Sequence, residues 1–441
     1  MTQAVSVGRA RLGLTGPMVW LACVLTLMPY LSPGRLLPSQ VQPWAALLAW
    51  AVVIVASLRG RRVQADMSVA LMLLFTTMML VYFPWDVPVD LADLVRKTIG
   101  IPLSIGLVIL GQNIDRSTLR SAVWVAACAY LFGAILQYVS TSAYLSVVRP
   151  FVDVVNIQIG SRGAASFAPE ATDLGFTMAF LLLIALLTYS SSDRRSRTAQ
   201  AVLVVIILTT AALSQSGTGI IASIVVLSLW LVQRLSRARK GLAIGALAVL
   251  AAILVYAVPS DEVTIRGFAL LQTSLSDPSA LLQTSFAHRI VHNLVAVIAF
   301  VSSAGLGFGA ASFTVVAPEI YVNYRIPQAL DLSSYYSAAV LETLGTNALS
   351  VTAQLLTEFG VVGLSLIALL VMRVARSRVR FKLAVGALLI FTWLQSFPAA
   401  YPPFWLLIGL VCNEDFTRRP PETSRKGTFE VSRKRRTVSV R

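Results

Sequence analysis

Apolar residues run along this chain in long continuous stretches, separated by short breaks that are charged or rich in Pro and Gly. A helix needs about 20 mostly apolar residues to cross the roughly 30 Å hydrocarbon core of a bilayer, and stretches near that length recur throughout. Strands of a membrane barrel would alternate apolar and polar positions, which this pattern excludes. The pattern predicts an all-α polytopic membrane protein with twelve spans, near residues 14–31, 43–58, 66–83, 95–111, 119–139, 171–189, 199–213, 217–233, 241–258, 357–373, 382–397 and 399–412.

The breaks between these spans differ in charge, and the difference predicts an orientation. Cytoplasmic loops of membrane proteins carry an excess of Lys and Arg. We therefore expect both chain ends to be cytoplasmic, together with the basic loops at 59–62, 116–120, 194–197, 234–240 and 373–382.

Two connections on the opposite, outer side are long, at about 140–170 and 259–356. The apolar stretch Ile290 to Ala304 in the second is short for a span. If it crossed alone, the basic loop 373–382 would face outward, so we predict an amphipathic helix at the outer interface. The expected parts are spans one to nine in 1–258, the large outer loop 259–356, spans ten to twelve in 357–412 and a basic tail, 413–441.

Composition supports a membrane protein, with 56% hydrophobic against 13% charged residues. The net charge of +16 does not indicate a nucleic-acid partner, because 28 of the 36 Lys and Arg lie on the predicted cytoplasmic side. The basic tail is either a segment that binds anionic membrane lipids or a solvated one. The three Cys residues lie in or beside spans, which provides neither a disulfide framework nor a metal site.

Ionisable residues beside a membrane are costly, so those on the poorly charged outer side are the candidates for chemistry. The first long loop contains Arg162 and Glu170, with Arg149 upstream. The second long loop begins its apolar helix after His288 and Arg289. Further polar candidates for substrate binding are Arg96, Lys97, Asn347 and Glu358.

Three motifs carry a resemblance to a known family. They are Arg-Gly-x-x-Ser-x-x-Pro-Glu at 162–170, a lone Arg289 before a helix that ends in Gly-Leu-Gly-x-Gly at 305–309, and Glu-Phe-Gly-x-x-Gly-Leu at 358–364. Their order and sidedness resemble the O-antigen polymerase and O-antigen ligase superfamily of the bacterial inner membrane, whose members have ten to fourteen spans and a large periplasmic loop late in the chain.

The resemblance implies a C-type membrane glycosyltransferase that needs no metal or other cofactor. Its donor would be a glycan on undecaprenyl diphosphate, attacked with inversion by a sugar hydroxyl. Its partners would be that lipid-linked oligosaccharide, membrane lipids, a chain-length regulator and a flippase, with no nucleic acid. Arg162 and Arg289 match the family's loop arginines.

The residues fit this chemistry. Without a metal, a diphosphate leaving group needs fixed cations, and the planar fork of Arg162 or Arg289 can bind phosphate oxygens in pairs. The acceptor hydroxyl needs a base. Desolvation at the mouth of a span could tune Glu170 for that role, and the alternative bases are His288 and His292. The two His stand four residues apart, which also admits a metal pair, although no acid lies in the same turn.

Each candidate also has an ordinary structural interpretation. An outer Arg can contact a lipid headgroup, and Arg96 and Lys97 are placed as lipid anchors at a span end. Glu170 suits the N-terminal cap of a helix. The glycines at 305–309 fit a loop turn better than a phosphate cradle.

One departure from the family separates its activities. Ligases carry a His where this chain has Asn347, so a polymerase of O-antigen or exopolysaccharide repeat units is favoured over a ligase that transfers polymer to the lipid A core. A transporter or flippase of lipid-linked oligosaccharide also suits twelve spans. Its expected signs, two similar halves with discontinuous helices at matching positions, are not evident in the sequence. A scaffold protein would leave the outer Arg and Glu residues unexplained.

Overall fold

The computed structural model describes residues 16–32, 41–81, 94–95, 98–152, 163–189, 194–234, 286–346, 348–379, 381–394, 401–413 and 416. Across these residues the regular elements are helices, and no strand occurs among them. The helices are α1 (Pro17–Leu27), α2 (Trp44–Leu58), α3 (Met67–Val81), α5 (Gly100–Asn113), α6 (Arg116–Val139), α7 (Thr141–Val148), α9 (Ala171–Thr188), α10 (Arg194–Leu213), α11 (Gly217–Arg234), α14 (Phe286–Ser302), α15 (Phe313–Asn323), α16 (Ile326–Ala329), α17 (Ser334–Leu344), α18 (Val351–Arg376), α19 (Lys382–Leu394) and α20 (Pro402–Cys412).

Each predicted span that falls in the described ranges is a helix near its expected bounds. α18 begins ahead of the predicted residue 357 because Ser350 caps it: the Ser350 hydroxyl oxygen accepts a hydrogen bond from the Ala353 amide at 2.9 Å. The predicted span at 241–258 and nearly all of the tail after Asn413 lie outside the described residues.

Four helical stretches are long and apolar enough to cross a bilayer, namely α6, α9, residues 196–213 of α10, and α18. The remaining apolar helices are shorter. Together these apolar helices indicate a membrane-embedded protein. Burial distinguishes their places: 89% of the apolar window in α9 is buried inside the protein, against 28% in α10, so α9 is a central helix and α10 a peripheral one.

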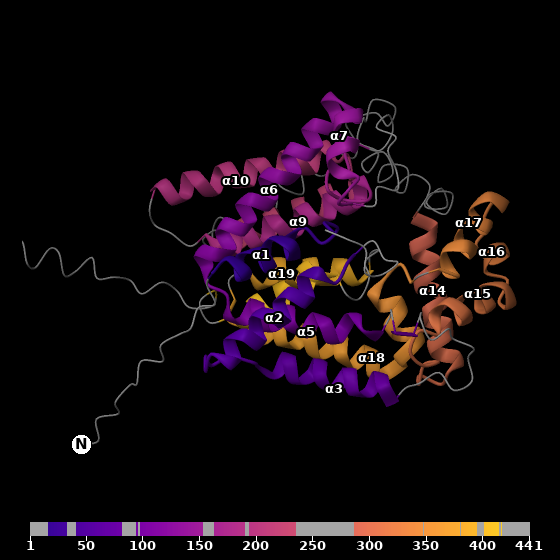
Figure 1. The fold of residues 1–441 in the computed structure, drawn as a ribbon. Helices are drawn as coiled ribbons and strands as arrows, with labels where there is room; N and C mark the ends of the chain where they lie inside the picture. The colour runs from indigo at the N-terminus through magenta and orange to yellow at the C-terminus, as the bar shows by residue number, and fades with distance from the viewer. Residues whose placement is uncertain are drawn as a thin grey trace, which may run out of the picture.

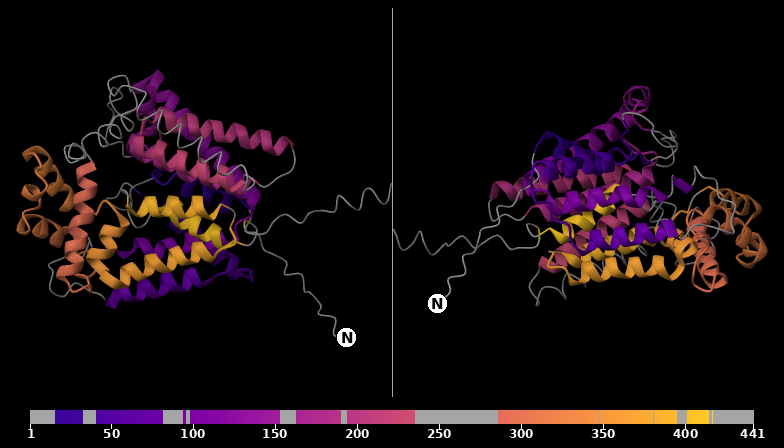
Figure 2. Two further views of the ribbon diagram at one scale, coloured as in Figure 1. Left: turned by 180° about the vertical axis from the view of Figure 1, so that it is seen from behind. Right: turned by 60° about the horizontal axis from the view of Figure 1, so that its bottom comes forward.

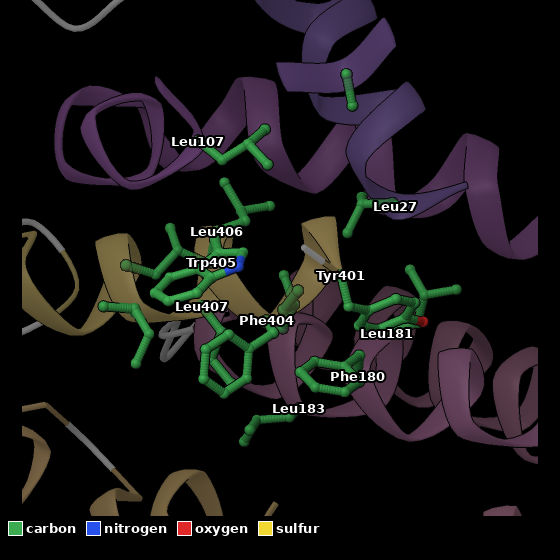
Figure 3. Packing of buried hydrophobic residues seen from close by; sticks show 14 of the residues in the cluster. Leu27, Leu107, Phe180, Leu181, Leu183, Tyr401, Phe404, Trp405, Leu406 and Leu407 are labelled. Atoms are coloured by element: carbon green, nitrogen blue, oxygen red, sulfur yellow. The ribbon is translucent and has the colours of Figure 1, made fainter. Parts of the chain in front are cut away.

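The core of the bundle surrounds α9 and α20. The aromatic rings of Phe176 and Phe391 stack at 5.4 Å between α9 and α19, and the Phe180 ring meets Tyr401, which precedes α20, edge-on at 5.5 Å. Figure 3 shows Phe180 and Tyr401 together with Phe404 and Trp405 of α20. Small residues let helices approach closely within a membrane. α9 and α11 meet at one such glycine pair, and α5 and α20 at another: Gly175 with Gly219, and Gly111 with Gly409.

The basic loops in the described ranges gather at one end of the bundle (Figures 1 and 2). Arg373, in the last turn of α18, forms a 2.6 Å ion pair with Asp66, which precedes α3. Asp66 also accepts a 2.6 Å hydrogen bond from the Gln112 side chain of α5. The Arg120 guanidinium of α6 lies over the Tyr189 ring at 4.5 Å, just past α9. Contacts within the bundle thus hold basic side chains at the end of α18 and near the start of α6.

A second group of helices, α14 to α17, lies beside the other end of the bundle (Figure 1), with α14 crossing the direction of the long helices. The helix predicted at Ile290 to Ala304 is therefore present, beginning at Phe286. Its apolar face forms a separate hydrophobic cluster with α15 and α17, whose members include Val291, Val295, Ala299, Phe313, Val316, Val340 and Leu344.

The helix α18 is broken at Gly360, a feature that the sequence analysis did not predict. Gly360 has φ 50° and ψ −127°, which stops the helical hydrogen bonding at that point. The freed carbonyls of Thr357 and Glu358 accept hydrogen bonds from the amides of Phe308 and Gly309, each at 2.9 Å. The Val361 amide donates to the Gly305 carbonyl at 2.7 Å. The loop 305–309 thus replaces the bonds that the break removes.

These bonds agree with a loop turn at the glycine run, which the sequence analysis preferred to a phosphate cradle. The amides of Phe308 and Gly309 are used by α18, and the Gly307 amide donates to the Ser303 hydroxyl at 2.9 Å. The glycines serve packing instead, because a Cβ at Gly307 would lie 2.6 Å from the Glu358 carbonyl oxygen.

Replacing Gly360 by Ala should destabilise the protein. An added Cβ would overlap the Gly305 carbonyl oxygen, and the backbone angle itself disfavours a side chain. Such strain costs about 1–3 kcal/mol. We expect a melting temperature several degrees lower for Gly360→Ala in detergent.

The matched control is Gly386→Ala in α19, where nothing lies within 4 Å of the added Cβ. It should melt at or above the wild-type temperature, because Ala favours a helix. Equal melting temperatures for the two variants would contradict the role of the break.

Candidate functional site

The first turns of α14 carry His288, Arg289 and His292, and two contacts fix their position against α18. The Asn293 side chain donates to the Arg289 carbonyl oxygen at 2.9 Å and accepts from the Ser350 hydroxyl at 3.0 Å. Since Ser350 also caps α18, the turn bearing Arg289 is fastened to the start of that helix.

The segment before α9 is held by buried side chains. The side-chain Oε1 of Gln137, on α6, accepts hydrogen bonds from the backbone amides of Ala165 and Ser166, at 2.8 and 3.0 Å. The Ser166 hydroxyl donates to the Tyr130 carbonyl at 2.7 Å, and the Tyr144 hydroxyl donates to the Ser166 carbonyl at 2.6 Å. These bonds set the path of the chain into α9.

Glu170 stands at the N-cap position of α9, as the structural interpretation expected, but its side chain makes no capping hydrogen bond. It is half-buried, and its charge acts on both Asp173 and Arg289. The side chain therefore belongs to a charged cluster rather than to a helix cap.

Asp173 is a member of this cluster that the sequence analysis missed. It lies in the first turn of α9, is half-buried, and accepts a hydrogen bond from the Tyr30 hydroxyl. The next turn of α9 is tied to the core, because the hydroxyls of Thr177 and Tyr401 are 2.9 Å apart. A lone carboxylate inside a predicted apolar span was the signal that could have identified it.

Arg289 is half-buried and lies within electrostatic range of both carboxylates. Burial lowers the pKa of Arg289, while the negative charges of Asp173 and Glu170 act in the opposite sense. A guanidinium stays protonated in proteins, and it has five N–H donors in a rigid fork. This arrangement can hold a permanent cation in a partly desolvated place, where its charge can attract an anionic ligand.

The two histidines of α14 converge on one threonine. Ring nitrogens of His288 and His292 each lie 3.2 Å from the Thr343 hydroxyl of α17. The other ring nitrogen of His292 accepts from the Leu349 amide at 3.2 Å. His292 is fully buried, and burial lowers its pKa to about 3, so the ring is neutral at physiological pH.

This geometry argues against a metal pair at the two histidines. Both nitrogens of His292 already have protein partners, which leaves none for a metal or for a substrate. Within the described ranges, no three His, Cys, Asp or Glu residues gather in a way that could hold a metal ion.

Arg149 and Glu358, two further predicted residues, are not among the charges that act on Arg289. Arg149 is exposed at the C-cap of α7, which lies apart from α14 in Figures 1 and 2. Glu358 is buried at the break in α18, where its carboxylate accepts from the Gln354 side chain at 3.3 Å. Four predicted residues lie outside the described ranges: Arg96, Lys97, Arg162 and Asn347.

A separate small pocket lies between α5, α18 and α20. Its lining is apolar and includes Ile101, Leu355 and Trp405.

The candidate functional site is the charged cluster of Arg289, Glu170 and Asp173, with His288 next to Arg289 in the sequence. It contains the groups that can do chemistry, whereas the pocket is apolar.

No protein-family model matches this chain, and no curated protein matches it either. The assignment of a function consequently depends on the chemistry of the residues themselves.

The cluster predicts a measurable coupling between Asp173 and Arg289. Asp173→Asn and Arg289→Gln should each lower the melting temperature, and the double variant should lose less than the sum of the two. Groups in one network show coupling energies of about 0.5–3 kcal/mol.

A control cycle pairs Asp173→Asn with Arg149→Gln, which sits on the exposed end of α7. That pair should be additive. Additive behaviour in the Asp173 and Arg289 cycle as well would rule out the charged cluster.

Proposed function

We propose that this protein is a glycosyltransferase of the bacterial inner membrane that polymerises oligosaccharide repeat units carried on undecaprenyl diphosphate. The proposal includes twelve spans, cytoplasmic chain ends and a periplasmic loop over 259–356. The product is an O-antigen or exopolysaccharide chain, and a chain-length regulator and a flippase are the expected partners. The motifs at 162–170, 305–309 and 358–364, which resemble the O-antigen polymerase and ligase superfamily, support this assignment.

The observation that carries the proposal is the position of Arg289. It is a half-buried cation, fastened to α18 through Asn293, at the end of the bundle opposite the basic loops. A diphosphate leaving group gains negative charge as its bond to the sugar breaks. A fixed, partly desolvated guanidinium stabilises that charge more strongly than a solvated one would.

The reaction is a substitution at the anomeric carbon. A hydroxyl oxygen of the acceptor sugar forms the new bond to that carbon as the carbon–oxygen bond to the diphosphate breaks. The electron pair of the broken bond leaves with the diphosphate, which Arg289 binds together with Arg162. The hydroxyl proton passes to a nearby base, for which the sequence offers Glu170, His288 and His292.

Asn347 favours the polymerase over the ligase, since ligases of the superfamily carry a His at that place. The break in α18 favours a second candidate, a flippase of lipid-linked oligosaccharide, because discontinuous helices bind substrates in many carriers. Hydrogen bonds from the loop 305–309 fill this break, however, so the carbonyls it frees are already occupied. We therefore prefer the polymerase.

The proposal predicts the effect of Arg289 variants in cells. Arg289→Ala should reduce polymer chains to single repeat units while the protein remains inserted and abundant, with a rate loss of about 10²–10³. Arg289→Lys should also lose most activity, because Lys keeps the charge but not the paired N–H fork. A glycan gel, with protein quantified from the same membranes, measures both.

Arg325→Lys is the matched control, an exposed Arg that precedes α16 in the same group of helices. Its ladder should equal that of the wild type. A normal polymer ladder in Arg289→Ala would reject the polymerase. A ladder that is lost in Arg289→Ala but normal in Arg289→Lys would favour a carrier that needs only positive charge.

A further inference from the structure

The hydrogen bonds around Thr343 determine which ring nitrogen of each histidine carries a proton. The Leu349 amide can only donate, so the Nδ1 atom of His292 accepts its hydrogen bond. A neutral imidazole has one protonated nitrogen, and in His292 that nitrogen is therefore Nε2. Its N–H donates to the Thr343 hydroxyl oxygen, 3.2 Å away.

The hydrogen bonds of Thr343 in turn determine which nitrogen of His288 is protonated. Its hydroxyl proton is donated to the Val340 carbonyl oxygen at 2.8 Å. The hydroxyl oxygen then has only lone pairs to offer, and a hydroxyl oxygen accepts up to two hydrogen bonds. The first comes from His292, so the Nδ1 atom of His288, 3.2 Å away, must be the second donor.

The consequence is a basic nitrogen at Nε2 of His288. With the proton on Nδ1, Nε2 carries the free lone pair of the ring, and no residue in the described ranges hydrogen-bonds to it. His288 is half-buried and directly precedes Arg289 in α14. The charge of Arg289 acts on His288, so the lone pair lies within electrostatic range of the cation that the proposed function assigns to the diphosphate.

We propose that His288 is the catalytic base of the polymerisation, with Thr343 and His292 as the positioning residues that fix its tautomer. This inference rests on the proposed function. When the acceptor oxygen attacks the anomeric carbon, its proton moves to Nε2 of His288 and the electron pair of the broken bond leaves on the diphosphate. The imidazolium then returns the proton to solvent.

The geometry favours His288 over the other two bases. His292 has both nitrogens in hydrogen bonds and is fully buried. Glu170 acts electrostatically on Arg289, so its charge serves to keep that cation in place. A carboxylate that gave up this role by taking a proton would weaken the cluster during the step that needs the cation most.

The charges around His288 suit a base that is neutral at pH 7. Burial and the adjacent Arg289 lower the pKa of His288 below its usual value of about 6.5. The elements packed against α14 carry the carboxyl groups of Glu319 on α15, Glu342 on α17 and Glu358 on α18, with Glu170 and Asp173 on the α9 side. None of these carboxyl groups is among the causes of the shift, which burial and Arg289 determine.

The first test reads the tautomers directly, without enzyme activity. The chain contains only two histidines, so protein labelled with ¹⁵N-histidine gives signals from two rings in a solid-state NMR spectrum of lipid-reconstituted protein. We expect opposite tautomers, Nδ1–H for His288 and Nε2–H for His292, with His288→Asn identifying which ring is which. An Nε2–H tautomer at His288 would overturn the inference.

The second test measures polymerisation as a function of pH. Full-length protein in nanodiscs is given the lipid-linked oligosaccharide extracted from a strain that lacks the gene. The wild-type rate should fall as pH decreases through the lowered pKa of His288, because a protonated ring cannot accept the hydroxyl proton. In His288→Asn an amide can still donate to Thr343, but no base remains, so the rate should fall by about 10²–10⁴ and lose this acid limb.

Variants of the positioning residue separate catalysis from folding. Thr343→Val removes the hydrogen-bond relay and should lower the rate and alter the pH profile, while Thr343→Ser should restore both. If the wild type is active and His288→Asn works within threefold of its rate, the base assignment is overturned and the polymerase stands. The same holds if the acid limb is lost in Glu170→Gln and kept in His288→Asn. A wild type that forms no polymer would overturn both.

Discussion

The arrangement depends on the hydrogen bonds that join α14 to both parts of the broken helix α18. Inside a bilayer, backbone amides and carbonyls need protein partners, so a helix can break only where another segment supplies them. At Gly360 the loop 305–309, which follows α14, does so through three backbone hydrogen bonds. At the start of α18 the side chains of His292 and Asn293 bind the Leu349 amide and the Ser350 hydroxyl.

Both ends of α14 are therefore fixed, and this places its polar residues. A short helix held at one end could swing and carry Arg289 away from α9. Held at both ends, it keeps Arg289 within electrostatic range of Glu170 and Asp173. The same attachment brings His288 and His292 to Thr343, so the fastening of the helix and the protonation of its histidines have one structural cause.

Charge compensation gives the site its chemical character. A half-buried guanidinium needs negative charge nearby, and a reactive phosphate needs an accessible cation. Glu170 and Asp173 meet the first need, because their negative charges act on Arg289. Tyr30, which donates to Asp173, in turn connects this carboxylate to the aromatic core around Tyr401 (Figure 3).

Much of the helical architecture could be predicted from the sequence, because continuous apolar runs are a direct requirement of the bilayer. The helix at α14 was predicted from its length and the charge of the loop that follows α18. Arg289 and Glu170 were chosen because charges on the outer side are rare. Their shared neighbourhood with Asp173 could not be predicted, since it depends on where the fold places the start of α14 relative to the first turn of α9.

The break at Gly360 and the histidine tautomers were beyond sequence reasoning for a similar reason. A Glu-Phe-Gly stretch reads as part of one continuous helix until the partner loop is known. The tautomer of His288 depends on Leu349 and Val340, two residues whose side chains take no part in the bonding. Almost every residue type has the same backbone amide and carbonyl, so the sequence does not show which of these groups bind a side chain. Only the fold shows what they donate to or accept from.

The most direct test of the central claim is a cryo-EM structure of the protein in nanodiscs with undecaprenyl diphosphate. The account predicts diphosphate density within hydrogen-bonding distance of the Arg289 guanidinium, with His288 beside it and the lipid chain running into the bundle. Diphosphate bound at the basic end, near Arg373 and Asp66, or bound with Arg289 out of reach, would contradict it.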